Sequence, residues 1–309
     1  MTYALLLCCV LGAAAAAGYA LGAVLAAAAA LRAEALPARW AFRLRAAPAA
    51  AGLLASVGLA LPAFLLHEPA ATRERPGLTA LTLAAAGAAL LARTLGAGLA
   101  SWRSSVGASR AWRRRAEPVA LPGAPAPAFR IHDPFPVVAV VGVMRPRLYV
   151  ASQVIDALTP AELAAVLAHE AGHLAARDNL RRLLLRFLPS TGWTRLARRL
   201  ERRWEAAAEV DADRCAGAAA LDLASALIKA ARLVPPGARL AVPAPAFHAG
   251  EGVAGRIRGL IEGAPASVPA SCGRGLAALW TALGGASAAL LPLLWRPLHA
   301  LSEALVQLP

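Results

Sequence analysis

The chain has 309 residues, a net charge of +14 and 59% hydrophobic residues, but only 5% aromatic residues. Because a typical soluble domain holds roughly 45–50% apolar residues, this composition predicts a membrane-embedded protein and points away from an ordinary soluble one. All but one of the 32 basic residues are arginines, and few aromatic side chains accompany them. The charge therefore favours a lipid bilayer with anionic headgroups as partner, and no nucleic acid is expected to bind.

Charge-poor apolar segments predict about four membrane-spanning helices, since roughly 20 such residues cross the hydrocarbon core. The predicted spans cover about residues 2–31, 46–66, 76–101 and 275–295. The first three form an N-terminal membrane domain over residues 1–115, and the fourth lies with a short tail in residues 275–309. Arginines follow the first and third spans, so the positive-inside rule places residues from about 103 to 274 in the cytoplasm.

The cytoplasmic segment begins with a proline-rich linker over residues 116–128, "AEPVALPGAPAPA", and continues as a predicted domain over residues 129–274. The stretch "FRIHDPFPVVAVVGVMRPRLYVAS" is rich in β-branched residues and has Gly142 and Arg145-Pro146 between two apolar runs. This pattern predicts a hairpin or a small sheet.

Helical signals follow the predicted hairpin. Thr159 and Glu162 have the spacing of a capping box, and Pro160 occupies the first helical position. They predict the start of a helix that carries the sequence HEAGH. An Arg/Leu amphipathic segment over residues 180–204 and a further helix from about 201 to 219 complete a mainly α fold with a small β element.

His169 and His173 in "VLAHEAGHLAARDN" are the candidate metal ligands. Residues four apart lie on one face of a helix, so both imidazoles can bind one ion, while Glu170 lies about 100° around the axis. This is the H-E-x-x-H arrangement of zinc proteases, in which the glutamate acts as general base. The pattern predicts one Zn²⁺ ion as cofactor and Glu170 as the catalytic base.

A catalytic zinc site needs a third protein ligand. Four acidic residues spaced four apart follow in "ERRWEAAAEVDADR": Glu201, Glu205, Glu209 and Asp213. Their spacing does not select one of them. A solvated acidic stripe neutralised by neighbouring arginines is the structural alternative for Glu201 and Glu205.

The segment "VGVMRPRLYVASQVIDALTPAELAAVLAHEAGHLAARDNLRRLL" closely resembles the membrane zinc metallopeptidases of the BlaR/MecR antirepressor family. In that family a hairpin with a Gly…Arg-Pro-Arg turn precedes an H-E-x-x-H helix followed by Arg-Asp-Asn. The resemblance covers about residues 135–260. It implies a zincin-like α+β protease domain with three membrane spans before it and one after it. It also implies Glu209 as the third metal ligand and Asp213 as a supporting carboxylate.

Ala212 departs from this pattern, because many relatives have cysteine there. The resulting E-x-x-A-D sequence resembles HtpX-type membrane proteases. Asp213, Asp178 and Asn179 are the candidates for residues that orient the ligand histidines, although Asp178 and Asn179 could equally cap the end of the helix.

These features predict a zinc endopeptidase that cleaves a protein or peptide substrate in regulatory proteolysis, with a cytoplasmic repressor as one candidate. The resemblance implies a multi-pass protein of the bacterial inner membrane. An HtpX-like quality-control protease and a catalytically inactive membrane scaffold are the alternatives. The substrate and the oligomeric state do not follow from the sequence.

Overall fold

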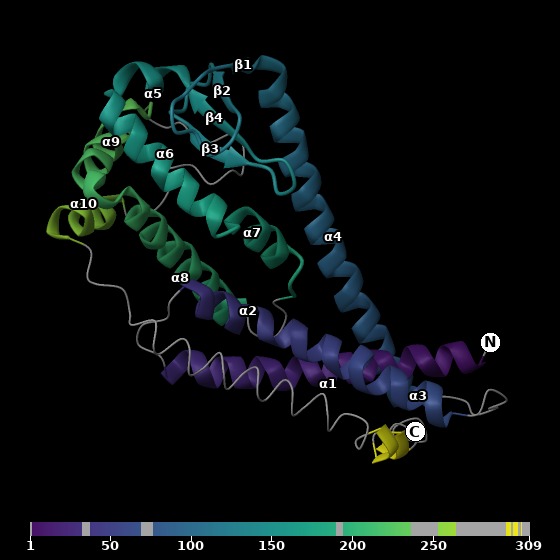
Figure 1. The fold of residues 1–309 in the computed structure, drawn as a ribbon. Helices are drawn as coiled ribbons and strands as arrows, with labels where there is room; N and C mark the ends of the chain where they lie inside the picture. Colours follow the sequence, from purple (N-terminus) through teal and green to yellow (C-terminus); the bar gives the residue numbers. More distant parts are fainter. Residues whose placement is uncertain are drawn as a thin grey trace. The chain divides into compact units, whose positions relative to one another are not determined.

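The computed structural model describes residues 2–32, 38–68, 77–189, 194–235 and 253–263, and residues 295–297, 299–301 and 304 near the C-terminus. The chain divides into two units. Unit 1 comprises Met1–Gly96, Leu188–Glu201 and Ser267–Pro309, and unit 2 comprises Ala97–Phe187 and Arg202–Ala266. The fold is mainly helical with one small mixed sheet, which confirms the predicted fold class at this level (Figure 1).

Unit 1 is built around long apolar helices. Helix α1 (Thr2–Arg32) packs against a continuous helical run of α2 (Ala38–Leu53), the π-helical η1 (Leu54–Ala60) and α3 (Leu61–His67). Ala51 of α2 lies against Gly18 and Gly22 of α1, a close approach of small residues that is common between membrane helices. Helix α4 (Leu78–Arg115) starts in unit 1 and continues into unit 2.

Three helices are long and apolar enough to cross a membrane: Tyr3–Leu31, Ala38–His67 and Leu78–Arg115. The second begins before the predicted residue 46, and the third continues past the predicted residue 101. The charge-free criterion finds the apolar middle of a helix, whereas arginines near its ends extend the helix beyond that core. The predicted fourth span lies outside the described residues.

The sheet of unit 2 has the order β1-β2-β4-β3. Its strands are β1 (Glu117–Pro118), β2 (Ala128–Ile131), β3 (Val138–Val141) and β4 (Arg147–Ala151). Strands β3 and β4 form the predicted antiparallel hairpin, while β2 pairs in parallel with β4. Gly142 in the hairpin turn has a φ of 108°, which favours glycine. The predicted linker is thus partly structured, because it contributes β1.

Alternating side chains of β4 fill the cores on opposite faces of the sheet. On one face of the sheet, Leu148 and Val150 pack with apolar residues of α6 (Pro160–Ala175) and α9 (Ala220–Leu233). On the other face, Tyr149 packs with Trp112 of α4. The remaining elements are α5 (Ser152–Ala157), α7 (Asp178–Arg186), α8 (Thr194–Asp213), η2 (Arg214–Ala219) and α10 (Val253–Glu262).

The capping box that opens α6 is present as predicted, with Thr159 as N-cap and Glu162 as its reciprocal partner. Glu162 also accepts hydrogen bonds from Ser225 and from Lys229 of α9, which fastens α6 to its neighbour. Burial acts to raise the pKa of Glu162, but these hydrogen bonds outweigh it and lower the pKa to about 2. The carboxylate therefore stays charged at neutral pH and holds the first turn of the helix that carries the site.

Candidate active site

Two histidine nitrogens face each other on α6. His169 is fully buried and His173 is nearly so, and their Nε2 atoms lie 3.2 Å apart. Two nitrogens bound to one zinc ion at about 2.05 Å and a tetrahedral angle are roughly 3.3 Å apart. The spacing of the two donor atoms therefore matches that of a shared zinc ion.

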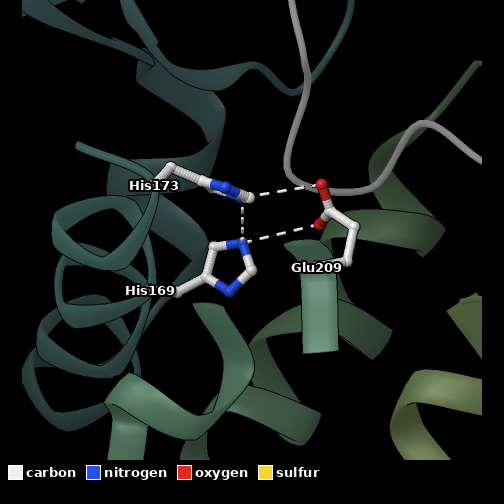
Figure 2. Close-up of side chains that lie close together, drawn as sticks. All are labelled: His169, His173 and Glu209. Atoms are coloured by element: carbon white, nitrogen blue, oxygen red, sulfur yellow. Dashed lines mark hydrogen bonds and ion pairs between the residues drawn. The ribbon is translucent and has the colours of Figure 1, made fainter. Parts of the chain in front are cut away.

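Glu209 of α8 completes the cluster (Figure 2). One of its carboxylate oxygens lies 3.7 Å from His169 Nε2 and the other lies 3.5 Å from His173 Nε2. One ligand atom from each of the three residues falls within 4.8 Å of the others. Two imidazoles and a carboxylate are a donor set that suits a catalytic zinc ion, which would retain an open fourth position. The residues present therefore fit the metal that the motif predicts.

Gly172 explains how α8 comes so close to α6. A Cβ atom at this position would lie 2.8 Å from Cys215 Sγ and 3.1 Å from Ala212 Cα. Both distances are shorter than ordinary van der Waals contacts, so only glycine permits this approach. The missing side chain at Gly172 thus allows α8 to pack closely on α6. This close packing brings Glu209 to the two histidines.

The outer nitrogens of both histidines meet carboxylates. Asp213 Oδ1 lies 2.9 Å from His169 Nδ1, and Asp178 Oδ2 lies 2.8 Å from His173 Nδ1. A carboxylate on Nδ1 holds that nitrogen as the protonated one and leaves the Nε2 lone pair free for a metal. Asp178 starts α7, directly after Arg177, whose left-handed φ of 55° ends the preceding helix.

Asn179 occupies a different place from the two aspartates. Its side-chain amide donates to the carbonyl oxygen of Val140 at 2.8 Å and to that of Gly142 at 3.2 Å. The residue therefore fastens the end of β3 to α7, and the structure gives it no contact with either histidine. Of the three proposed supporting residues, Asp213 and Asp178 lie beside the ligand histidines and Asn179 lies at the sheet.

The charges of the cluster act on each other. Burial acts to lower the pKa of His173, but hydrogen bonds to Asp178 and Glu209 outweigh it and raise the pKa to about 9. Burial acts to raise the pKa of Glu209, but His173 and the charge of Arg256 lower it. Because a histidine binds a metal only in its neutral form, a proton on His173 would compete with a metal ion.

Glu170 lies beside this cluster. It is buried, and one carboxylate oxygen accepts a hydrogen bond of 3.2 Å from the backbone N–H of Val140 in β3. Burial raises the pKa of Glu170 above its usual range, although the neighbouring histidines act against the shift. A carboxylate with a raised pKa is the stronger base, which suits proton transfer near neutral pH.

The geometry separates the four acidic residues that spacing alone leaves equivalent. Glu201 belongs to unit 1 and accepts a 2.7 Å hydrogen bond from the buried Arg45. Glu205 is exposed and is not part of the cluster of potential ligands. Asp213 contacts the Nδ1 atom of His169. Of the four acidic residues, Glu209 is the one whose carboxylate lies close to the Nε2 atoms of both histidines.

Arg256 of α10 is a neighbour of the cluster that the sequence analysis missed. Its Nε donates to Asp213 Oδ2 at 2.9 Å, and its Nη1 lies 3.0 Å from Glu209 Oε2. It balances the charge of both carboxylates. Since Arg256 stands in a short helix without a recognisable motif, only the tertiary contact reveals its place.

One comparison with known proteins bears on this site. Residues 139–207 match the model of Peptidase family M48. The match includes the H-E-x-x-H segment and indicates a metallopeptidase, and it ends two residues before Glu209. It does not separate the BlaR/MecR group from HtpX-type proteases. No curated protein and no solved structure matches the chain.

Proposed function

We propose that the protein is a membrane-bound zinc endopeptidase that hydrolyses a peptide bond of a protein substrate. The observation that carries this proposal is the convergence of His169, His173 and Glu209, with ligand atoms within 4.8 Å of one another, beside the buried Glu170. The family match over residues 139–207 and the three apolar helices support it.

In this proposal His169, His173 and Glu209 hold the metal. A bound zinc ion would acidify a coordinated water molecule and polarise the substrate carbonyl group. Glu170 would take the proton of the attacking water and later deliver it to the leaving amine. Asp213 and Asp178 would keep the two imidazoles in the tautomer that binds a metal, because each lies on an Nδ1 atom.

We further propose regulatory proteolysis on the cytoplasmic side of the bacterial inner membrane, with a cytoplasmic repressor as a candidate substrate. The Arg-Asp-Asn run at Arg177–Asn179 supports this assignment, as do the arginines after the first apolar helix and those in the C-terminal part of the third. One observation favours quality-control proteolysis of membrane proteins instead. Ala212 gives the E-x-x-A-D sequence of HtpX-type enzymes.

Substitution of the general base tests the proposed activity. Glu170→Gln keeps the size of the side chain but cannot accept the proton, so we expect cleavage of β-casein by the detergent-purified chain to fall by about 10²–10⁴-fold. Zinc content should stay at the wild-type level. Glu205→Gln, an exposed change on α8, serves as the control and should keep full activity. Equal activity of Glu170→Gln and wild type would refute the proposal.

The same variant separates the two biological roles. Cells that express Glu170→Gln should accumulate one soluble regulator if the enzyme serves regulatory proteolysis. Many membrane proteins should accumulate if it serves quality control. Quantitative proteomics against cells that express the wild-type chain distinguishes the two patterns.

A further inference from the structure

We propose that Arg182 of α7 stabilises the oxyanion that forms on the substrate carbonyl during hydrolysis. This inference rests on the proposed function and assigns a role that the motif residues leave open. His169, His173 and Glu209 account for the metal, and Glu170 accounts for proton transfer. Apart from the metal itself, none of them supplies a hydrogen-bond donor aimed at the developing negative charge, although such donors usually make a large contribution to catalysis.

Arg182 lies at the edge of the ligand cluster. Its Nη2 atom is 3.6 Å from Oε1 of Glu209, the carboxylate oxygen on the side of His173. This distance is that of an ion pair but exceeds that of a hydrogen bond, so Nη2 keeps its hydrogen-bonding capacity beside Glu209. Arg256 meets the other oxygen, Oε2, at 3.0 Å and also binds Asp213. Glu209 therefore already has a close cationic partner besides Arg182.

The guanidinium of Arg182 also has an unused donor. Its Nη1 atom is buried and has no hydrogen-bond partner among the described residues. A buried donor without an acceptor costs free energy, so an oxygen atom that accepts a hydrogen bond from Nη1 would be stabilised there. The guanidinium offers two parallel N–H groups, which fit an oxygen that carries negative charge.

Packing fixes the orientation of this side chain. The Cζ atom of Arg182 lies 5.6 Å from the centre of the Trp204 ring, and Trp204 is fully buried. A cation held over an aromatic face loses less entropy when it forms a hydrogen bond, because it is already ordered. The side chain as a whole keeps 21% of its surface exposed, so it borders the solvent although its Nη1 atom is buried.

Hydrolysis begins with the addition of water to the substrate carbonyl group. The water oxygen forms a bond to the carbonyl carbon while Glu170 takes a proton from that water. The π electron pair moves onto the carbonyl oxygen, and Arg182 donates hydrogen bonds to the resulting oxyanion. When the carbonyl group forms again, the C–N bond breaks and its electron pair leaves with the nitrogen, which receives the proton from Glu170. No further co-reactant is needed.

The test compares Arg182→Gln and Arg182→Lys with the wild-type chain, all full length and in detergent. Arg186→Gln is the matched control, because Arg186 stands one turn later on α7 and is exposed. The measurements are kcat and KM with β-casein, zinc affinity by chelator competition, and the inhibition constant of a phosphinic peptide, whose anionic tetrahedral phosphorus imitates the oxyanion. Thermal unfolding verifies that each variant is folded as stably as the wild-type chain.

We expect Arg182→Gln to lower kcat by about 10²–10³-fold, as loss of one oxyanion donor does elsewhere. The phosphinic peptide should bind more weakly by the same factor as kcat/KM falls, and zinc affinity should stay within about threefold of wild type. Arg182→Lys should recover part of both losses, whereas Arg186→Gln should behave as wild type.

Three results would overturn the proposal. A changed zinc affinity with unchanged kcat would show that Arg182 only balances the charge of Glu209. A change in KM alone would show that it binds another part of the substrate. Parallel loss in Arg186→Gln would indicate a general effect of charge on α7. If wild-type chain neither binds zinc nor cleaves casein, the proposed function itself fails, and that outcome is seen before any Arg182 variant is measured.

Discussion

At the scale of single residues, the site depends on which nitrogen of each histidine carries the proton. His169 and His173 can bind one metal through Nε2 only if Nδ1 holds the proton, and Asp213 and Asp178 enforce this at 2.9 and 2.8 Å. Such a partner on a ligand histidine raises the basicity of the ligand and fixes its ring. We therefore expect the two aspartates to matter for metal binding as much as the proposed ligands do.

Asp213→Asn tests this role. The amide keeps the shape of the carboxylate but loses its charge, so we expect zinc affinity to fall by about 10–100-fold. Chelator competition on the purified chain measures the change. Asp211→Asn is the control on the same helix, because Asp211 is exposed and pairs with Arg214. Unchanged zinc affinity in Asp213→Asn would show that the contact with His169 does not tune the ligand.

The motif residues were predictable because their spacing is local. His169, Glu170 and His173 follow from helical periodicity alone. Glu209 and Asp213 could be assigned only through a family resemblance, since four acidic residues share one spacing. Arg256 was not predicted, because its contacts with Asp213 and Glu209 join residues more than 40 positions apart, and no local pattern records such contacts.

At the scale of elements, the distance between α6 and α8 decides whether Glu209 reaches the histidines. Gly172 faces Cys215 and Ala212 so closely that even one added carbon atom would crowd them. The contact also limits the size of residue 212, and the alanine found there is buried. A small residue at both positions is the element-level condition for the metal cluster.

Gly172→Val should therefore push α8 away from α6. We expect a loss of stability of about 1–3 kcal/mol from overpacking and a lower zinc content, because the third ligand moves with the helix. Thermal unfolding and metal analysis measure the two effects. Gly259→Val in α10 is the control, since a Cβ atom there meets nothing within 4 Å. A Gly172→Val chain with wild-type zinc content would contradict this account of the packing.

The sequence predicted some elements well and others poorly. The capping box at Thr159 and the β3–β4 hairpin follow from short-range patterns, and both are present. The parallel pairing of β2 with β4 was not predicted. These strands are neighbours in the sheet, but β3 lies between them in the sequence, so the pairing leaves no local sequence pattern. Helix α4 extends to Arg115 because its arginines favour a helix as much as its apolar residues do.

At the scale of the whole molecule, one chain combines three long apolar helices, the third of which is α4, with a segment that matches a metallopeptidase family. Helix α8 belongs to both units: residues up to Glu201 lie in unit 1, and the part with Glu209 and Asp213 lies in unit 2. The buried Arg45 binds Glu201 and the carbonyl oxygens of Leu188 and Pro189, so the first part of this helix is fixed within unit 1.

The zinc content of the full-length chain in detergent tests the central claim most directly. Wild type and Glu205→Ala should each retain one zinc ion per chain after dialysis against metal-free buffer, and Glu209→Ala should lose it, because Glu209 lies near both Nε2 atoms and Glu205 is exposed outside the cluster. Retention of zinc by Glu209→Ala together with its loss from Glu205→Ala would contradict the account.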